Sequence, residues 1–421
     1  MRKTKFSFLL AFSLVGLFYS CSSSVKNSAT FIIWTDRQEI VSYTELFNSL
    51  QNKIKAVVVY KPRLSNSLPP AKDEEKPDLV IGSWLKNERT RKNFRPLDNL
   101  LSPDAVNAST IYAPLLEYGK TAGKQYLLPV SFNLPLVLFA AKNEYLLPDN
   151  YSLTLDQIRD TAANFNNKNK NDFYVKMGFA PSWDKEFLYT VTKNFAPCFK
   201  EKGTSFIWND ENLLKAVRYI RTWTEEKNTS VTAEQDFQFK YLYTPKYRQV
   251  TEERILFAYS TSGEIFNHSF EQIGDIDYRW ITINQKTPVE DDIVSMAIYK
   301  NSKNPQASQK FIVWFFNENS QKMMLDRTAQ MNLASSTFGI ASGFSSLRSV
   351  NEHFFPTYYR NLLGNLPSEK TLSEPQAFPS RWSSLKERVI YPYLFDALKS
   401  NSTTESKELQ DLLNAWAKQF D

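Results

Sequence analysis

Few side chains in this sequence are of the types that perform catalysis or hold a metal ion. The 421 residues contain only two histidines, His268 and His353, and two cysteines, Cys21 and Cys198. A zinc site needs a cluster of such ligands, and a Ser-His-Asp triad would need one of the two histidines as its base. Because an isolated histidine is more often structural or exposed, we expect no catalytic residue and no bound metal.

The sequence does not match the motifs typical of nucleotide binding or of a nucleophilic serine. Gly119-Lys120-Thr121 resembles the end of a phosphate-binding loop, but the glycine required five positions before Gly119 is replaced by Pro114. Neither G-x-G-x-x-G nor G-x-S-x-G occurs, and the chain has only 11 glycines. We therefore expect no nucleotide site and no cofactor.

One acidic triplet, Glu290-Asp291-Asp292, stands out. Its carboxylates could bind a hard cation, but we interpret it as a solvated loop or a strand cap. Two carboxylates for glycoside hydrolysis can come from distant parts of a chain. The sequence therefore leaves that chemistry open, although no local motif favours it.

Aromatic and polar side chains follow two predicted strands at their carboxyl ends. Residues 31–34 form an apolar strand ending in Trp34, with Asp36 and Arg37 just beyond it. The strand at 78–82 is followed by Ser83 and Trp84. In doubly wound sheets the ligand crevice lies beyond the carboxyl ends of the strands, so these residues are candidate ligand contacts.

The elements that would position these side chains alternate along the chain. A strand at 31–34, a helix ending near residue 50 and strands at 55–60 and 78–82 predict an α/β, doubly wound sheet with parallel strands. Hydrophobic residues make up 42% and charged residues 23%, which is ordinary globular usage. The prolines at 129 and 135 make 127–139 extended rather than helical.

The first 20 residues have the form of an export signal. Three basic residues precede an apolar run from Phe6 to Tyr19, which is too short for a comfortable membrane span. Because Cys21 follows a small residue, residues 1–20 resemble a lipoprotein signal peptide, with Cys21 lipidated and 21–28 a polar tether. An ordinary secretory signal or a short anchor helix is the alternative. The formal net charge of +6 is too mild and too evenly spread to predict nucleic-acid binding.

Four stretches resemble one known family in their order and spacing. They are Phe31-Ile-Ile-Trp-Thr-Asp36 with its following helix, Pro77-Asp-Leu-Val-Ile-Gly82, the run from Gly123 through Pro129 to Lys142, and Asn304-Pro to Trp314. Together they resemble the extracellular solute-binding lipoproteins of bacterial ABC importers, in the sugar-binding, maltose-binding-protein-like group. The sequence Gly-Ser-Trp at 82–84 and the low glycine content depart from common members.

The resemblance implies a two-lobed periplasmic-binding-protein fold of type II, with doubly wound sheets joined by crossover hinge segments. Lobe one is expected at 29–137 and 289–335, and lobe two at 138–288 and 336–421. The solute is expected in the cleft between the lobes, which close as a hinge.

The resemblance also implies the residues that contact a sugar. Aromatic rings cover the apolar faces of a pyranose, and polar side chains bind its hydroxyl rim. The expected ligand-binding residues are Trp34, Asp36, Arg37, Ser83, Trp84, Ser131, Asn133, Trp183, Ser260, Ser262, Glu264 and Phe344.

The implied function is the substrate-binding component of an ABC transporter that captures a carbohydrate or similar polar solute. It is expected to be a monomer, not an enzyme, held by a lipid anchor on the periplasmic side of the inner membrane. Its partners would be the solute and the permease subunits. The alternatives are the same fold with a non-sugar solute, a carbohydrate-active surface enzyme, or a surface lipoprotein that binds host or envelope partners.

Overall fold

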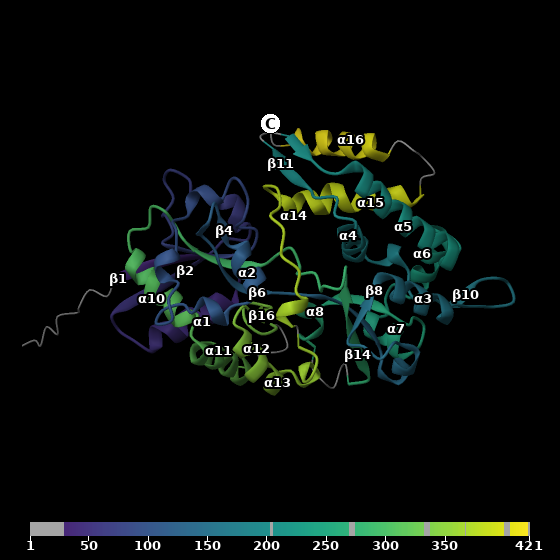
Figure 1. Cartoon of the computed structure of the whole chain (residues 1–421), viewed down its shortest axis with the longest axis horizontal. Helices are drawn as coiled ribbons and strands as arrows, with labels where there is room; N and C mark the ends of the chain where they lie inside the picture. The colour runs from purple at the N-terminus through teal and green to yellow at the C-terminus, as the bar shows by residue number, and fades with distance from the viewer. Residues whose placement is uncertain are drawn as a thin grey trace, which may run out of the picture.

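The computed structural model describes residues 29–202, 205–268, 274–331, 337–366, 368–399 and 405–419. The predicted signal and tether, including Cys21, lie outside these residues. The described chain forms two lobes, each built on a mixed β-sheet (Figure 1). Among the described helices, none combines the length and the apolarity that crossing a bilayer requires.

The six-stranded sheet of lobe one contains the predicted parallel strands. Its order is β16 (Phe344–Ser345), β6 (Leu128–Phe132), β15 (Val294–Ile298), β3 (Leu79–Gly82), β1 (Ala29–Thr35) and β2 (Ile54–Tyr60). The strand β1 pairs in parallel with β2 and β3, as expected, whereas β15 runs antiparallel to β3 and β6. The sheet is therefore mixed, and the carboxyl ends of β1, β2 and β3 share one edge.

Amphipathic helices cover the sheet of lobe one. Phe47 of α1 packs edge-on against Phe311 of α10 with ring centroids 5.1 Å apart, and Phe311 also contacts Phe31 of β1. These aromatic side chains bury the apolar face that the sequence pattern predicts. The helices of this lobe are α1 (Glu39–Ser49), α2 (Ala113–Tyr118), α10 (Pro305–Phe315), α11 (Glu318–Gln330), α12 (Arg348–His353) and α13 (Phe355–Tyr358).

Lobe two is built on a four-stranded sheet. Its order is β13 (Ala258–Thr261), β7 (Pro135–Ala140), β14 (Ile276–Thr282) and β8 (Ser152–Thr154). The sheet carries α3 (Leu155–Phe165), α4 (Lys185–Asn194), α5 (Asp210–Asn228), α6 (Val231–Lys240), α7 (Lys246–Thr251), α8 (Ser262–Ile265), α14 (Trp382–Leu385), a π-helical turn η10 (Lys386–Ile390), α15 (Tyr391–Lys399) and α16 (Glu405–Ala417). Three short hairpins lie outside the two sheets. The hairpin β4–β5 (Lys120–Thr121, Lys124–Gln125) precedes β6 in lobe one, whereas β9–β10 (Asn167–Lys168, Tyr174–Lys176) and β11–β12 (Lys200–Lys202, Ser205–Ile207) belong to lobe two.

In the part of the chain that the structure describes, three crossover segments run between the lobes and are joined by backbone hydrogen bonds. The first connects β6 to β7, and the second connects β14 to β15. The amide of Glu290 on the second donates to the carbonyl of Asn133 on the first, 2.9 Å away. The third includes residues 368–381, and the amide of Thr287 donates to the carbonyl of Thr371 on it, at 2.6 Å. The three crossovers are therefore hydrogen-bonded to one another side by side where the two lobes meet.

The expected lobe boundaries need two corrections. We expected lobe two to resume at residue 336, but β16 pairs with β6 in the sheet of lobe one. The reason is that Phe344 packs in an aromatic cluster with Phe132 and Phe355 of lobe one, so the chain enters lobe two only after this segment. At the first crossover, β7 begins at Pro135 rather than after residue 137.

Candidate functional site

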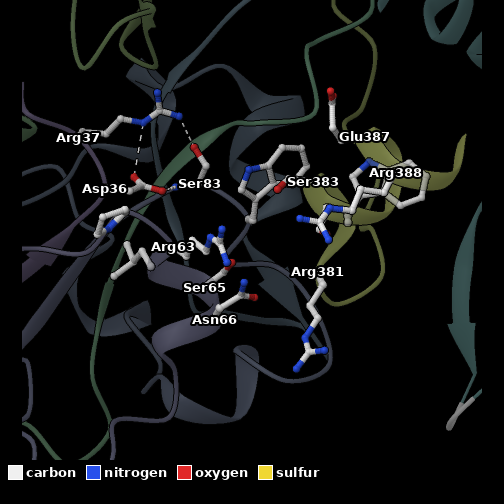
Figure 2. Close-up of a pocket in the computed structure, with 15 residues that line it drawn as sticks. Asp36, Arg37, Arg63, Ser65, Asn66, Ser83, Arg381, Ser383, Glu387 and Arg388 are labelled. Atoms are coloured by element: carbon white, nitrogen blue, oxygen red, sulfur yellow. Dashed lines mark hydrogen bonds and ion pairs between the residues drawn. The ribbon is translucent and has the colours of Figure 1, made fainter. Parts of the chain in front are cut away.

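A cavity of about 480 Å³ lies between the lobes (Figure 2). We call it the interlobe cavity. Loops that follow β1, β2 and β3 line it from lobe one, and α14 with η10 lines it from lobe two. The lining residues are Asp36, Arg37, Pro62, Arg63, Leu64, Ser65, Asn66, Ser83 and Trp84 from lobe one, and Arg381, Trp382, Ser383, Ser384, Glu387 and Arg388 from lobe two.

A hydrogen-bonded junction holds the lobe-one wall together at the strand ends. The amide of Ser83 donates to Asp36 Oδ2 at 3.2 Å, and the Ser83 hydroxyl donates to the carbonyl of Asp292 at 2.9 Å. Glycine is needed at position 82 because a Cβ there would lie 2.4 Å from Asp36 Oδ1. The loops after β1 and β3 are thus fixed against each other.

Arg37 links this wall to the second crossover. Its guanidinium donates to the Ser83 hydroxyl, lies 3.5 Å from Asp36 Oδ1, and reaches Asp292 Oδ2 at 3.4 Å. The side chain is 21% exposed, so its charge remains accessible from the cavity. Arg37 can therefore bind a ligand while it holds the crossover.

Burial raises the pKa of Asp36 to about 6, although Arg37 and the Ser83 amide act in the opposite direction. The negative charge of Asp292 adds to the rise. A fraction of the Asp36 carboxyl groups is consequently protonated just below neutral pH, and a protonated carboxyl can donate a hydrogen bond as well as accept one.

Trp84 is half-buried, and its ring reaches across to lobe two. It packs against the apolar cluster of that lobe, and the ammonium of Lys386 lies 5.9 Å from its ring centroid. Its backbone has a φ of +62°, a left-handed conformation that is rare for a bulky residue. Strained residues of this kind occur at ligand-binding sites among other places.

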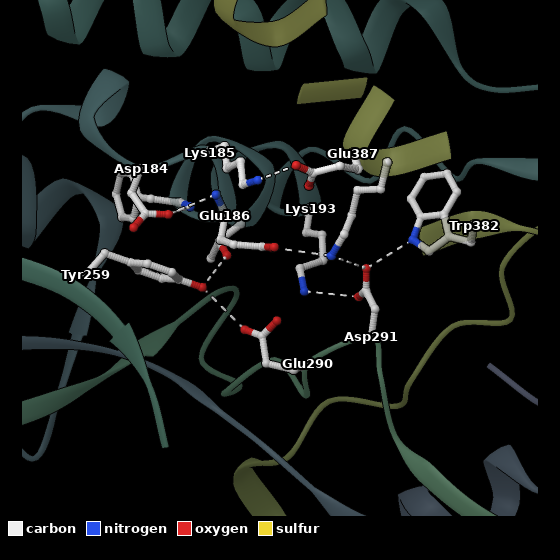
Figure 3. Close-up of polar contacts among 12 residues, drawn as sticks. Asp184, Lys185, Glu186, Lys193, Tyr259, Glu290, Asp291, Trp382 and Glu387 are labelled. Carbon is white, nitrogen blue, oxygen red and sulfur yellow. Dashed lines mark hydrogen bonds and ion pairs between the residues drawn. The ribbon is translucent and has the colours of Figure 1, made fainter. Parts of the chain in front are cut away.

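A buried ion cluster lies beneath the lobe-two wall (Figure 3). Asp291 Oδ1 lies 3.2 Å from Lys193 Nζ, Asp291 Oδ2 lies 3.8 Å from Lys386 Nζ, and the Trp382 indole donates to Oδ2 at 3.3 Å. Lys386 also pairs with Glu186, 3.3 Å away. Figure 3 shows Glu186 and Lys193 on α4, Asp291 on the second crossover and Trp382 on α14. Lys386 belongs to η10.

The pKa values in the cluster follow from its charges. Burial acts to raise the pKa of Asp291, but Lys193 and Lys386 outweigh it, and the pKa falls below its usual value. For Glu290, burial dominates and raises the pKa to about 7. Our expectation of a solvated loop at 290–292 was wrong for Glu290 and Asp291, which are 9% and 7% exposed. Lys193 and Lys386 pair with Asp291, and burial raises the pKa of Glu290.

The structure brings four of the predicted ligand residues together at the cavity: Asp36, Arg37, Ser83 and Trp84. Two predicted aromatic contacts are instead buried in lobe one. Trp34 is 1% exposed, packs among apolar side chains and carries Lys61 Nζ 4.4 Å above its ring. Phe344 is fully buried in its aromatic cluster.

Three residues predicted as polar ligand contacts instead form hydrogen bonds at or beside the first crossover. Ser131 donates to the carbonyl of Ala341 at 3.1 Å, Asn133 donates to the carbonyl of Ser342 at 2.9 Å, and Ser262 donates to Asn133 Oδ1 at 2.7 Å. They do not line the interlobe cavity. In this structure they join the first crossover to its neighbours.

The remaining predicted contacts lie on lobe two, away from the interlobe cavity. Ser260 donates to Glu264 Oε2 at 2.9 Å. The ring of Trp183 stacks on Phe237 at 5.6 Å between centroids, and its indole donates to the carbonyl of Glu234 at 2.9 Å. Of the two tryptophans at predicted strand ends, Trp84 lines the interlobe cavity and Trp34 does not, so a position at a strand end does not determine which way a ring points.

Sequence reasoning missed two groups of lining residues. Arg63, Ser65 and Asn66 follow β2, and the same strand-end rule could have found them. The residues of α14 and η10 carry no local signal, because their place depends on the long third crossover. No group of three or more His, Cys, Asp or Glu side chains suited to a metal ion is found in the described ranges.

Comparisons with known proteins agree with this architecture. The sequence profile of the family described as bacterial extracellular solute-binding protein matches residues 43–337. A search of curated proteins gave no significant match.

Among solved structures, the chain is similar to the GacH receptor of Streptomyces glaucescens, solved unliganded and with acarbose, at 14% identity and a TM-score of 0.59, covering 93% of this chain and 98% of that one. It is similar to the substrate-binding protein Lmo0181 of Listeria monocytogenes in complex with cycloalternan, at 13% identity and a TM-score of 0.61, covering 94% and 99%. It also resembles the lacto-N-biose complex of the galacto-N-biose/lacto-N-biose I-binding protein of Bifidobacterium longum, at 12% identity and a TM-score of 0.59, covering 93% and 96%. At these identities the likeness shows the fold.

Proposed function

This chain belongs to the bacterial extracellular solute-binding family, and from that premise we propose that it captures a carbohydrate for an ABC importer. The observation that carries the proposal is the interlobe cavity, which both lobes line with polar side chains around one half-buried tryptophan. A ligand that touches both walls favours the closed arrangement of the lobes, because only that arrangement supplies both sets of contacts. The structural relatives bound to saccharides support the choice of ligand class.

Within the cavity, we propose that Trp84 covers one apolar face of a pyranose ring. Asp36, Ser83 and Arg37 bind the hydroxyl rim from lobe one, while Ser383 and Ser384 bind it from lobe two. No water need be activated for this role. Both lining carboxylates are already engaged with cations, Asp36 with Arg37 at 3.5 Å and Glu387 with Lys185 at 2.5 Å.

We further propose that the protein is a monomer anchored by lipid on Cys21 and delivers its solute to two permease subunits. Family membership means that the protein is exported. The basic start, the short apolar run and the small residue before Cys21 support the anchor. Lipoprotein modification adds several acyl chains, whereas a single chain binds membranes only weakly.

Native mass spectrometry of the purified protein tests this function, with oligosaccharides added and then recovered. We expect one saccharide bound per chain and recovered at unchanged mass. A saccharide that is cleaved or otherwise altered would show an enzyme instead. Failure to bind any saccharide while an amino acid, peptide or polyamine binds would show a different solute class.

A further inference from the structure

The interlobe cavity carries more positive charge than a neutral sugar requires. Four arginines line it, namely Arg37, Arg63, Arg381 and Arg388, against two acidic residues, Asp36 and Glu387. Both acids are neutralised on their own lobe, by Arg37 and Lys185 respectively. Of the four arginines, Arg37 is already paired with both Asp36 and Asp292, so the excess positive charge that concerns the ligand is that of Arg63 and Arg388.

Arg63 and Arg388 lie on opposite walls of the cavity. Within the ranges that the structure describes, neither guanidinium has a carboxylate partner, and Arg388 donates only to the amide oxygen of Gln419 at 3.2 Å. Figure 2 shows Arg63 on the lobe-one wall and Arg388 on the lobe-two wall, with both side chains directed toward the space between them. Two cations on opposite walls repel each other when the lobes approach, unless an anion lies between them.

A second cavity, of about 800 Å³, continues this basic surface. We call it the adjoining cavity. It shares Arg381 with the interlobe cavity and is also lined by Arg89, Lys92 and Lys202. Its two acidic residues already have partners on the protein. Glu88 forms an ion pair with Arg91 at 2.5 Å, and Glu201 accepts a hydrogen bond from the Ser380 amide at 2.9 Å.

Each cavity also offers one partly exposed indole ring. Trp84 lines the interlobe cavity and Trp416 lines the adjoining cavity, so a chain of sugar rings can meet an aromatic surface at both positions. Guanidinium groups bind carboxylate and sulfate through paired, planar hydrogen bonds that a sugar hydroxyl cannot match.

We infer that the solute is an anionic oligosaccharide, whose carboxylate or sulfate groups lie between Arg63 and Arg388 and extend past Arg381 toward Lys92 and Lys202. This inference rests on the proposed carbohydrate-binding function and names its substrate class. The arginines that face each other without a counter-ion then receive one from the ligand, so binding and lobe closure are coupled through charge.

Capture from three pools of oligosaccharides tests the inference. One pool is prepared from pectin and alginate and carries carboxylates, one from carrageenan carries sulfates, and one from starch, mannan and galactan is neutral. Purified protein is incubated with each pool, and bound species are identified by mass spectrometry. We expect enrichment from a charged pool, and the pool that is enriched identifies carboxylate or sulfate as the anion.

The outcomes separate the inference from the function on which it rests. Enrichment only from the neutral pool overturns the anionic class and leaves carbohydrate binding intact. Enrichment from no pool overturns both. Equal enrichment from charged and neutral pools also overturns the inference, because the arginines would then make no difference to selection.

Variants then locate the charge effect. For the enriched oligosaccharide, Arg63→Gln and Arg388→Gln should each weaken affinity by about tenfold, since each removes a charge-assisted hydrogen bond. Arg218→Gln on α5 changes the net charge equally but lines neither cavity, so its affinity should match that of the original protein. Thermal unfolding of Arg63→Gln, Arg388→Gln and Arg218→Gln, compared with the original protein, confirms that all three variants fold. Unchanged affinity in both cavity variants would contradict the assignment of these arginines.

Discussion

Arg37, which follows the first strand of lobe one, lies 3.4 Å from Asp292 on the crossover that returns from lobe two. One side chain on the wall of the interlobe cavity thus contacts the second crossover directly. If the ligand is anionic, as we propose, the carboxylate of Asp292 would compete with it for the Arg37 guanidinium. A change at this contact should therefore be felt in binding.

Replacing Asp292 with Asn should raise the affinity for an anionic oligosaccharide by a few-fold, because a competing negative charge is removed. The backbone carbonyl that accepts from Ser83 is retained. Isothermal titration calorimetry measures the effect, with Asp104→Asn, an exposed position outside the cavity, as the control. A weaker affinity in Asp292→Asn would show that this carboxylate positions Arg37 rather than competes for it.

Trp84→Ala should weaken oligosaccharide binding by about three- to tenfold, because the ring that covers an apolar sugar face is lost. Trp84→Phe should fall between this variant and the original protein. Quenching of tryptophan fluorescence on titration provides the measurement. Tyr243→Ala, at a side chain that is 96% exposed, is the aromatic control. If Trp84→Ala binds as tightly as the control, the ring is not a ligand contact.

Binding of an anionic ligand should weaken as the pH rises from 5 to 7.5. The pKa of Asp36 is raised to about 6, so this residue gains a negative charge within that interval. The groups that act on it are Arg37, Asp292 and the Ser83 amide. The carboxylates and sulfates of the ligand are already ionised, so repulsion increases, and we expect affinity to fall about three- to tenfold. Calorimetry at several pH values should give a flat profile for Asp36→Asn; a profile as steep as that of the original protein would contradict the role of Asp36.

Asp291→Asn should destabilise the protein by about 3–5 kcal/mol, because Lys193 and Lys386 would then be buried without their shared carboxylate. Urea denaturation followed by circular dichroism measures the loss. Asp160→Asn breaks the exposed pair with Arg159 and should cost less than about 1 kcal/mol. Equal losses in the two variants would mean that the buried cluster contributes no more than a surface ion pair.

Cys21→Ala should move the protein from the membrane fraction to the soluble fraction of cells, because the proposed lipid attachment site is removed. Phase separation in a non-ionic detergent measures the change. Cys198→Ala leaves Cys21 in place and should partition like the original protein. Membrane association that survives Cys21→Ala would point to an uncleaved anchor helix instead.

Local sequence patterns were enough to predict much of lobe one. Short apolar runs predicted β1, β2 and β3. The strand-end rule selected Asp36, Arg37, Ser83 and Trp84, which line the interlobe cavity, and their contact with a ligand stays a prediction. The resemblance to solute-binding proteins, and with it the two-lobed α/β fold, is confirmed. These features depend on residues that lie close together in the chain.

Features that depend on distant contacts could not be predicted in this way. The strand-end rule does not tell which side of the sheet a ring faces, and Trp34 is buried. The charges of Glu290 and Asp291 suggested exposure to solvent, but Lys193 and Lys386, each about a hundred residues away in the sequence, lie beside Asp291. The lobe-two wall at 381–388 depends on a crossover whose path has no local pattern.

Hydrogen–deuterium exchange of the protein, with and without the captured oligosaccharide, tests the central claim most directly. The claim is that one ligand is held by both lobes in the interlobe cavity. We predict slower exchange at residues 36–37, 63–66 and 83–84 of lobe one, and at 381–388 of lobe two, in the same titration. Slowing confined to one lobe, or to a surface that shares none of these segments, would contradict it.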